Sequence, residues 1–195
     1  MRRVAIALLL WLVASVTGCD WPAKTPAFKL SDITGAEFGR DFQLTDHAGK
    51  LRTLADFKGK VVVVFFGYTY CPDACPTTMG ELALVMKELG KDADRLQVLF
   101  ITVDPERDTP AVLSQYVPAF HPGFLGLYGD ADAIARTARE FKVFFQKQPT
   151  PGGGYTVDHS AGSYLYDAAG RLRLFAQYGA GAQTLLHDIR LLLQQ

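Results

Sequence analysis

Two cysteines separated by three residues are the residues of this sequence best suited to chemistry. Cys71 and Cys75 follow a run of β-branched and aromatic residues, Val61 to Phe66, and precede a helical pattern. A helix N-terminus stabilises negative charge through its dipole and free N–H groups, so we expect a lowered thiol pKa. Thiolates are also the form that binds soft metal ions. The pair therefore predicts a redox site or a metal site.

The residues around the cysteines suggest how the sulfurs lie. Pro72 disfavours helical geometry at Cys71, and Pro76 suits the first position of a helix. We therefore expect both sulfurs on a turn, with more slack than the C-x-x-C redox motif allows, so that both can face one metal ion. A structural disulfide closing so short a loop would add little stability. A functional role therefore explains the cysteine pair better than a structural disulfide does.

Histidines are the next candidates, because two thiolates form an incomplete metal site. The sequence contains four: His47, His121, His159 and His187. His47 and His121 occur in turn-like contexts, and His187 occurs in an amphipathic helix. In these places a surface or partly satisfied histidine is the ordinary interpretation. His159 lies between a Pro- and Gly-rich loop, residues 146–154, which we expect to be mobile, and a predicted strand. Spacing leaves both roles open for His159, metal ligand or structural residue.

The elements around these residues predict an α/β fold. Strands that alternate with helices and end in a hairpin plus a helix indicate a mixed sheet with helices on both faces. With a cysteine pair after the central strand, this is the plan of a thioredoxin-like domain with an N-terminal β-hairpin extension. Thr78 and Glu81 have the spacing of a capping box. The expected strands are 42–45, 51–54, 61–66, 96–103, 124–128, 163–167 and 172–175, and the expected helices end near Gly90 or span 110–116, 131–141 and 182–193.

The first residues are typical of an export signal. Arg2 and Arg3 precede an apolar run and a set of small residues before Cys19. Val16 to Cys19 resembles the lipobox of bacterial lipoproteins, which predicts lipidation of Cys19; an uncleaved anchor helix is the alternative. We expect a signal peptide over 1–18, a linker over 19–37 and the domain over 38–195. In lipoprotein sorting of the enterobacterial kind, an acidic residue after the lipidated Cys, here Asp20, implies retention at the periplasmic side of the inner membrane.

Composition limits the classes of function. The chain has 195 residues, which suits one domain, and 20 basic and 20 acidic side chains. Removing residues 1–18 takes away two arginines and no acid, so 18 basic and 20 acidic side chains remain. No basic cluster interleaved with aromatic residues occurs, which argues against nucleic acid as a partner. With Cys19 lipidated, Cys71 and Cys75 would be an isolated pair in an oxidising compartment.

Three motifs resemble the signatures of the Sco/SenC family of copper-binding cytochrome c oxidase assembly proteins. They are YTYCPDACPTTM (68–79), TVDPERDTP (102–110) and DHSAGSYLYD (158–167). The resemblance covers the chain from Phe42 to the C-terminal helix. It implies a thioredoxin-like fold that binds copper through Cys71, Cys75 and His159. It also implies delivery of copper to the binuclear copper centre of a haem–copper oxidase, with some members acting mainly as thiol reductases of that centre.

The chemistry of the residues agrees with that resemblance. Two soft thiolates and one imidazole suit three-coordinate Cu(I), and they can hold Cu(II) if an oxygen ligand joins, whereas structural zinc ordinarily takes four protein ligands. The implied partners are the copper-accepting subunit of cytochrome c oxidase and another periplasmic copper chaperone or thioredoxin-like reductant. Asp104, Glu106, Arg107 and Asp108 follow the second buried strand on the same edge. They are either helix caps and solvated charges, or Asp104 or one of its neighbours orients His159 or docks a partner.

Two other functions compete with a copper metallochaperone. A thiol–disulfide oxidoreductase needs both cysteines but not His159. Against it stand the wide spacing and the absence of a tryptophan beside the motif, since the tryptophans are Trp11 and Trp21. A peroxiredoxin-type peroxidase is disfavoured because Thr69 lies one residue short of the Thr-x-x-Cys spacing. The copper metallochaperone is the first prediction, and reductase activity is the alternative.

Overall fold

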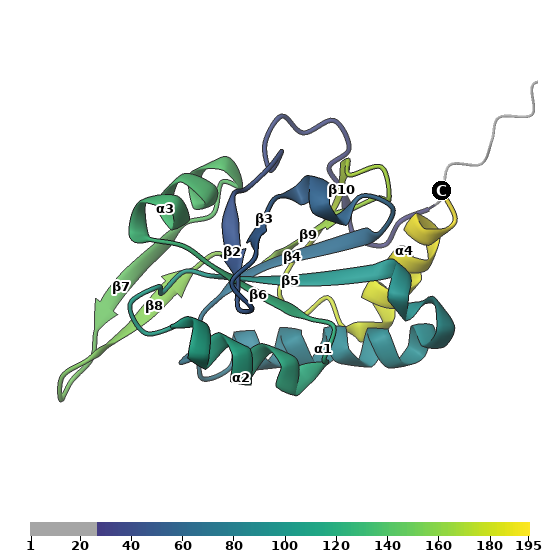
Figure 1. The fold of residues 1–195 in the computed structure, drawn as a ribbon. Helices are drawn as coiled ribbons and strands as arrows, with labels where there is room; N and C mark the ends of the chain where they lie inside the picture. The colour runs from purple at the N-terminus through teal and green to yellow at the C-terminus, as the bar shows by residue number, and fades with distance from the viewer. Residues whose placement is uncertain (1–26) are drawn as a thin grey trace, which may run out of the picture.

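The computed structural model describes residues 27–195, so the predicted signal peptide and Cys19 lie outside the described residues (Figure 1). The helices are α1 (Ala74–Leu89), α2 (Pro110–Phe120), α3 (Ala131–Glu140) and α4 (Ala182–Leu193), with short 3-10 helices at Leu54–Phe57 and Gly90–Arg95. The strands are β1 (Ser31–Asp32), β2 (Leu44–Asp46), β3 (Leu51–Arg52), β4 (Val61–Gly67), β5 (Leu96–Thr102), β6 (Leu125–Tyr128), β7 (Phe145–Pro149), β8 (Tyr155–His159), β9 (Ser163–Tyr166) and β10 (Leu172–Ala176).

Strand β4 is the centre of an eight-stranded mixed sheet. The strand order is β1-β10-β9-β4-β5-β6-β2-β3, and β4 pairs in parallel with β5 and antiparallel with β9. All seven residues of β4 are buried, as are all seven of β5. A strand that is covered on both faces and flanked on both sides carries an uninterrupted apolar sequence, which is what Val61 to Phe66 showed. The predicted central position of this strand is confirmed.

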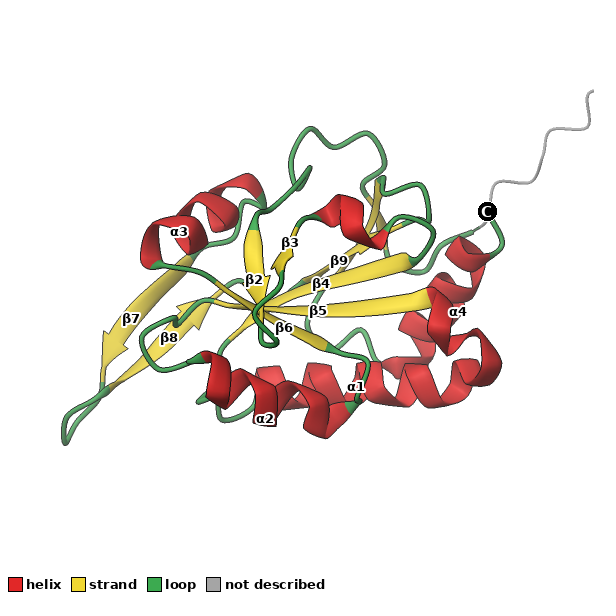
Figure 2. Cartoon of the chain, viewed as in Figure 1, coloured by secondary structure: helices red, strands yellow, loops and turns green. Residues whose placement is uncertain are grey.

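Helices cover both faces of the sheet, as Figure 2 shows. On one face Phe65 packs against Phe100, whose ring contacts Tyr116 of α2 at a centroid distance of 5.8 Å. On the other face Phe66 packs against Phe141, which directly follows α3, with centroids 5.1 Å apart. Neighbouring side chains of β4 thus pack on opposite faces of the sheet, because successive residues of a strand point to opposite faces.

Strands from the N-terminal part of the chain form both edges of this sheet. The predicted N-terminal hairpin forms as β2 and β3, and β2 pairs with β6, so the hairpin is the sheet's outer edge. At the opposite edge β1 pairs with β10. The boundary between linker and domain at residue 38 stays a prediction, although Ser31 and Asp32, within the predicted linker, already belong to the sheet. No described helix is long and apolar enough to cross a membrane.

Two local predictions are wrong. The segment predicted as a mobile loop over 146–154 is part of a two-stranded hairpin, in which β7 pairs with β8 and Gly152 to Gly154 make the turn with positive φ. Helix α1 begins at Ala74 after Asp73, so Cys75 lies inside the first turn of the helix and Thr78 and Glu81 form no capping box. The hairpin was missed because Pro and Gly residues of a tight turn resemble those of an irregular loop.

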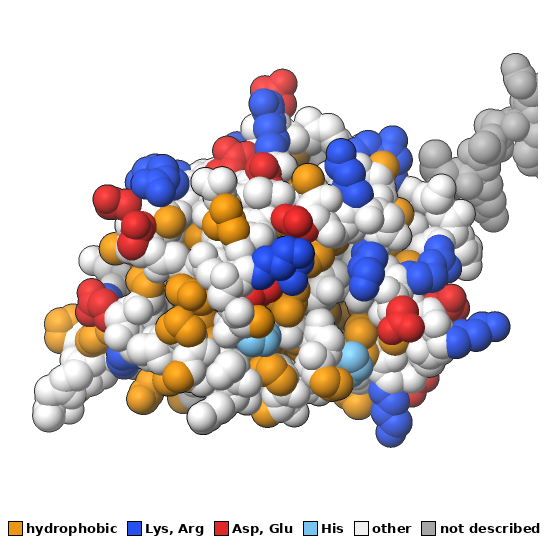
Figure 3. Space-filling view, viewed as in Figure 1, with side chains coloured by type: hydrophobic (Ala, Val, Ile, Leu, Met, Phe, Trp, Pro, Cys, Tyr) orange, Lys and Arg blue, Asp and Glu red, His pale blue; other side chains and the backbone are white. Residues whose placement is uncertain are grey.

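Charged side chains of both signs occur over the face shown in Figure 3, with Lys and Arg more frequent on the right side of the view. Acidic and basic side chains are interspersed there, and none gathers into a patch of one sign. This distribution fits the equal totals of basic and acidic residues in the sequence.

Candidate metal centre

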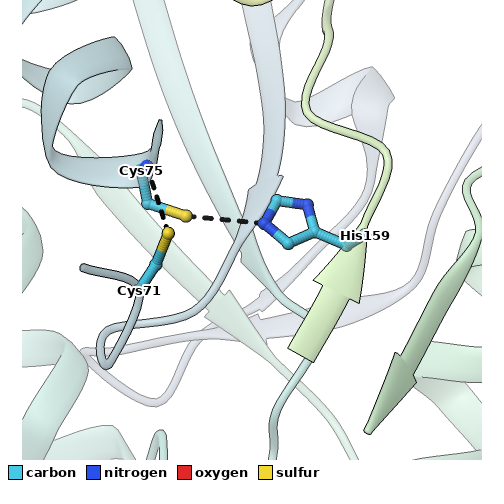
Figure 4. A group of neighbouring side chains, drawn as sticks. All are labelled: Cys71, Cys75 and His159. Atoms are coloured by element: carbon cyan, nitrogen blue, oxygen red, sulfur yellow. Dashed lines mark hydrogen bonds between the residues drawn. The ribbon is translucent and has the colours of Figure 1, made fainter. Parts of the chain in front are cut away.

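Cys71, Cys75 and His159 lie together at the carboxyl end of β4 (Figure 4). Their Sγ and imidazole nitrogen atoms all lie within 4.8 Å of one another. Sγ of Cys75 is 3.6 Å from Nε2 of His159, and the Cys75 amide donates a hydrogen bond of 3.4 Å to Sγ of Cys71. Among the described residues, this is the one cluster of three or more potential ligands of the His, Cys, Asp and Glu types.

The turn after β4 and the start of α1 position the two sulfurs. The Cys71 amide bonds to the Tyr68 carbonyl oxygen at 3.2 Å, which closes the turn, and Cys71 is half-buried. Cys75 is fully buried, with 0% exposure. Its sulfur packs against Gly67, where an added Cβ would meet Sγ at 2.9 Å. The absence of a side chain at Gly67 therefore makes the space that the Cys75 sulfur fills.

The expected drop in cysteine pKa does not hold for Cys75. Burial raises the pKa of this thiol, and the adjacent Cys71 sulfur and the Asp108 carboxylate add to the effect. In this environment desolvation outweighs the helix N-terminus, because a buried thiolate loses its hydration. A bound cation reverses that balance, since a coordinating thiol is deprotonated outright. The protein by itself therefore keeps Cys75 protonated, and a metal ion would displace the proton.

His159 reaches the cysteines from the end of β8. Its Nδ1 lies 3.0 Å from the Ser160 carbonyl oxygen, and a carbonyl only accepts, so Nδ1 carries the proton and Nε2 presents its lone pair toward Cys75. The ring is fixed edge to face by Tyr68 and Phe65. Burial also lowers the pKa of His159, which keeps the imidazole neutral. Both effects prepare Nε2 as a ligand.

The geometry fits a three-coordinate ion with soft ligands. Three ligand atoms at bond lengths of about 2.3 Å around one ion lie about 4 Å apart. The observed upper limit of 4.8 Å needs only a small closure to reach this separation. Met79 and Met86 are not part of the cluster, because both side chains are buried in the core.

The other histidines have structural partners. Nδ1 of His47 accepts a hydrogen bond from the Gly126 amide, and Nδ1 of His121 accepts one from the Gly123 amide. His187 pairs with Asp188 at 2.7 Å. The interpretation of these three as partly satisfied histidines is confirmed.

The acidic residues after β5 are not solvated charges, with the exception of Glu106. Asp104 is fully buried and accepts hydrogen bonds from Arg107 and from the Tyr155 hydroxyl, but not from His159. Asp108 is also buried and accepts from the amide and hydroxyl of Thr69 and from Thr102, which ties the turn after β4 to β5. Thr109 is the N-cap of α2.

Two further residues lie beside the site. Arg107 and Tyr155 connect the loop after β5 with the hairpin that ends at His159. The sequence already placed Arg107 among the neighbours of Asp104 that could orient His159 or dock a partner. Sequence reasoning missed Tyr155, which directly follows the segment 146–154 that was predicted as a loop.

Known proteins resemble this chain over most of its length. Residues 31–194 match the SCO1/SenC family model. The chain is 43% identical over 147 residues to the mitochondrial SCO2 homolog of Bos taurus, covering 74% of this chain and 54% of the relative. It is 39% identical over 185 residues to the mitochondrial SCO2 homolog of Mus musculus, covering 92% of this chain and 71% of that relative. The chain thus spans about half to about two thirds of the length of these relatives.

Solved structures share the fold. Bradyrhizobium japonicum ScoI, determined with copper bound, superposes with a TM-score of 0.74 at 43% identity, covering 81% of this chain and all of that one. Yeast Sco1 with copper bound gives a TM-score of 0.74 at 35% identity, covering 82% of this chain and 90% of that one. The family model, these relatives and these structures agree, and the chain belongs to the SCO1/SenC family.

Proposed function

We propose that this domain is a copper metallochaperone that binds one copper ion through Cys71, Cys75 and His159 and passes it to a cytochrome oxidase. The observation that carries the proposal is the convergence of two sulfurs and one imidazole within 4.8 Å. Soft thiolates select Cu(I), and the imidazole allows the site to hold Cu(II) with an added oxygen ligand. Two family members with copper bound in their structures support the choice of metal.

The site is built for release as well as for binding. Cys75 is buried, but Cys71 is half-buried beside the exposed Tyr70, so one side of the cluster is open to a partner. A sulfur from the acceptor can enter on that side while the bonds to this protein are breaking. A site closed by four protein ligands would hold the ion instead. We therefore propose the copper-accepting subunit of the oxidase as the partner.

The proposed setting is the outer side of a membrane. Lipidation of Cys19 would leave the chain from Asp20 onward as a linker between a lipid anchor and the domain. The bovine and mouse relatives are named as mitochondrial proteins, whereas the lipobox-like segment favours a periplasmic location for this chain. Mass spectrometry of the protein purified from membranes tests the anchor: a lipid mass on Cys19 supports it, and an intact residue 1–18 segment excludes it.

The experiment that tests copper binding is an anaerobic Cu(I) titration of the reduced domain against a competing chelator. The parent is compared with His159→Ala, the double variant Cys71→Ser/Cys75→Ser and the control His121→Ala, whose imidazole bonds to a backbone amide outside the cluster. One tightly bound ion, with weaker binding in the first two variants only, supports the proposal. Equal affinity in the parent and His159→Ala would exclude the three-ligand site.

Thiol–disulfide exchange is the second candidate, and the proximity of the two sulfurs favours it. In that reaction the Cys71 thiolate attacks a partner disulfide and forms a mixed disulfide, and Cys75 then displaces the partner's sulfur. The partner gains two electrons and two protons, and this chain keeps a Cys71–Cys75 disulfide. Reduction of an oxidised copper-site peptide at the same rate by the parent and by His159→Ala would favour this function. A rate that depends on His159 would count against it.

A further inference from the structure

We propose that Arg107 is the positioning residue for His159, because its guanidinium fastens the β7–β8 hairpin to the turn that carries Cys71. The inference rests on the proposed function, since it concerns the third ligand of the same copper site.

The β7–β8 hairpin needs an anchor of this kind. In the described part of the chain, β7 and β8 pair only with each other and not with the main sheet. His159 is the last residue of β8, so the position of its ring depends on how the hairpin is held.

Arg107 holds the hairpin at the start of β8. Its Nη1 donates a hydrogen bond of 2.8 Å to the Tyr155 carbonyl oxygen, and its Cζ lies 3.8 Å from the centre of the Tyr155 ring. The Tyr155 hydroxyl donates to Oδ1 of Asp104 at 2.8 Å, and Nε of Arg107 donates to Oδ2 of the same carboxylate. Asp104 is fully buried, so this carboxylate is a fixed hydrogen-bond acceptor for both side chains.

The same guanidinium also contacts the turn on the other side of the metal centre. Its Cζ lies 4.8 Å from the centre of the Tyr70 ring and 5.7 Å from that of Tyr68, within the range of cation–π interactions. Tyr70 directly precedes Cys71, and the Tyr68 ring packs edge to face against His159 with centroids 5.8 Å apart. One cation therefore contacts aromatic rings from both segments that supply ligands.

Planarity of the guanidinium is essential in this arrangement. Nη2 of Arg107 is buried and has no hydrogen-bond partner among the described residues. That end of the side chain is therefore held by the aromatic rings rather than by an acceptor. A lysine is a compact, strongly hydrated charge that neither stacks on rings nor donates to two acceptors in a fixed fork. We expect Arg107→Lys to behave like loss of the side chain rather than as a conservative change.

The other ion pair on the hairpin is exposed and provides a comparison. Nζ of Lys147 bonds to Glu106 at 2.5 Å, but the two side chains are 43% and 70% exposed. Exposed pairs of this kind add little to stability. The Arg107 side chain is 24% exposed and its carboxylate partner 0%, so Arg107 makes the stronger connection between the hairpin and the loop after β5.

A double-mutant cycle with His159 tests the inference. Arg107→Met keeps most of the apolar stem and removes the guanidinium. We expect it to weaken Cu(I) binding about tenfold in the parent, at the lower end of what loss of a residue supporting a ligand costs. In the His159→Ala background the same change should leave the affinity unaltered, because no third ligand remains to be positioned. Tyr155→Phe, which removes only the hydroxyl bond to Asp104, should give a smaller loss that also vanishes with His159.

Arg173→Met is the matched control. Arg173 also pairs with a buried carboxylate, Asp167, at 3.1 Å and lies over an aromatic ring, Phe28, but it is on β10 away from the cluster.

A second readout needs no copper: hydrogen exchange of the backbone amides from Tyr155 to His159 in the apo protein. Arg107→Met should speed exchange in the hairpin while leaving the amides of β4 protected, whereas Arg173→Met should leave the hairpin unchanged.

Each outcome has one meaning. Equal weakening of Cu(I) binding in both backgrounds, or unchanged affinity and unchanged hairpin exchange in Arg107→Met, would overturn the positioning role. If His159→Ala by itself leaves the affinity unchanged, the three-ligand copper site fails first and the inference fails with it. If Arg107→Met still speeds hydrogen exchange in the hairpin in that case, Arg107 anchors the hairpin but has no role in copper binding. A loss that depends on His159 supports both proposals.

Discussion

Sγ of Cys75 lies 3.6 Å from Nε2 of His159, although the two residues are 84 positions apart in the chain. The sheet creates this proximity. β4 leads into α1, and β8 leads into β9, which pairs antiparallel with β4 so that Phe65 lies opposite Ser163. The end of one strand and the start of its neighbour therefore meet at one edge. The metal centre is a consequence of the β4–β9 register, and a slip of that register would separate the ligands.

The pH dependence of stability should report the burial of His159. Burial lowers the pKa of His159 in the folded state below its ordinary value of 6.5. In the window between the two pKa values the unfolded chain binds a proton that the folded protein does not, so stability falls as the pH drops through that window and is fully present above about pH 6.5. Urea denaturation of the apo protein at several pH values measures this. His159→Gln should give a flatter curve, and parallel curves would show that burial does not shift this histidine.

Gly67→Ala should damage both stability and the metal centre. A Cβ at this position would meet Cε2 of Phe100 at 2.8 Å and Sγ of Cys75 at 2.9 Å. Overpacking of this kind costs about 1–3 kcal/mol, and a shift of Cys75 should also weaken Cu(I) binding. Gly80→Ala is the control, because nothing lies within 4 Å of its added Cβ and the residue is in α1. There we expect unchanged affinity and a gain of about 0.5–1 kcal/mol in helix stability. Equal effects of the two substitutions would contradict the packing argument.

The elements that sequence predicted well are those with a strong hydrophobic pattern. β4 and β5 are uninterrupted apolar strands, and α4 has a clear amphipathic period, so each was placed within a residue or two. The cysteine pair was equally clear, because two isolated thiols beside a predicted helix are typical of a redox or metal site. His159 could be singled out by its neighbourhood, but its proximity to Cys75 depends on strand pairing, which one sequence does not reveal.

The predictions that failed depend on long-range contacts. The β7–β8 hairpin has exposed side chains along β7, so its sequence carries no period-two hydrophobic signal. Asp104 and Asp108 resemble surface charges in the sequence because nothing local indicates their partners, which lie on the hairpin and on the turn after β4. The pKa of Cys75 was misjudged for the same reason, since its local helix terminus was visible in the sequence and its burial was not.

The two thiols should differ in reactivity when the reduced protein is free of metal. Cys71 is half-buried, whereas Cys75 is fully buried and its pKa is raised by burial. Because the thiolate is the reactive species, we expect iodoacetamide to modify Cys71 at least about tenfold faster. Mass spectrometry of digests taken over time measures both rates. Saturating Cu(I) should protect both residues, and protection of neither would argue against their role as ligands. Faster labelling of Cys75 would contradict the burial described above.

Asp188→Ala should loosen the entry of the chain into the domain without affecting copper. The fully buried Asp188 carboxylate on α4 accepts hydrogen bonds from the backbone amides of Lys29, at 2.9 Å, and Leu30, at 2.7 Å. Hydrogen bonds to a charged group contribute about 1.5–3 kcal/mol each, so the loss of two should lower the free energy of unfolding by about 3–6 kcal/mol. Urea denaturation measures the loss, with the exposed Asp94→Ala as the control. Cu(I) affinity should stay within about twofold of the parent, since changes at separate sites act independently. A parallel loss of affinity would mean that this anchor and the metal centre are coupled through α1 and α4, which pack together.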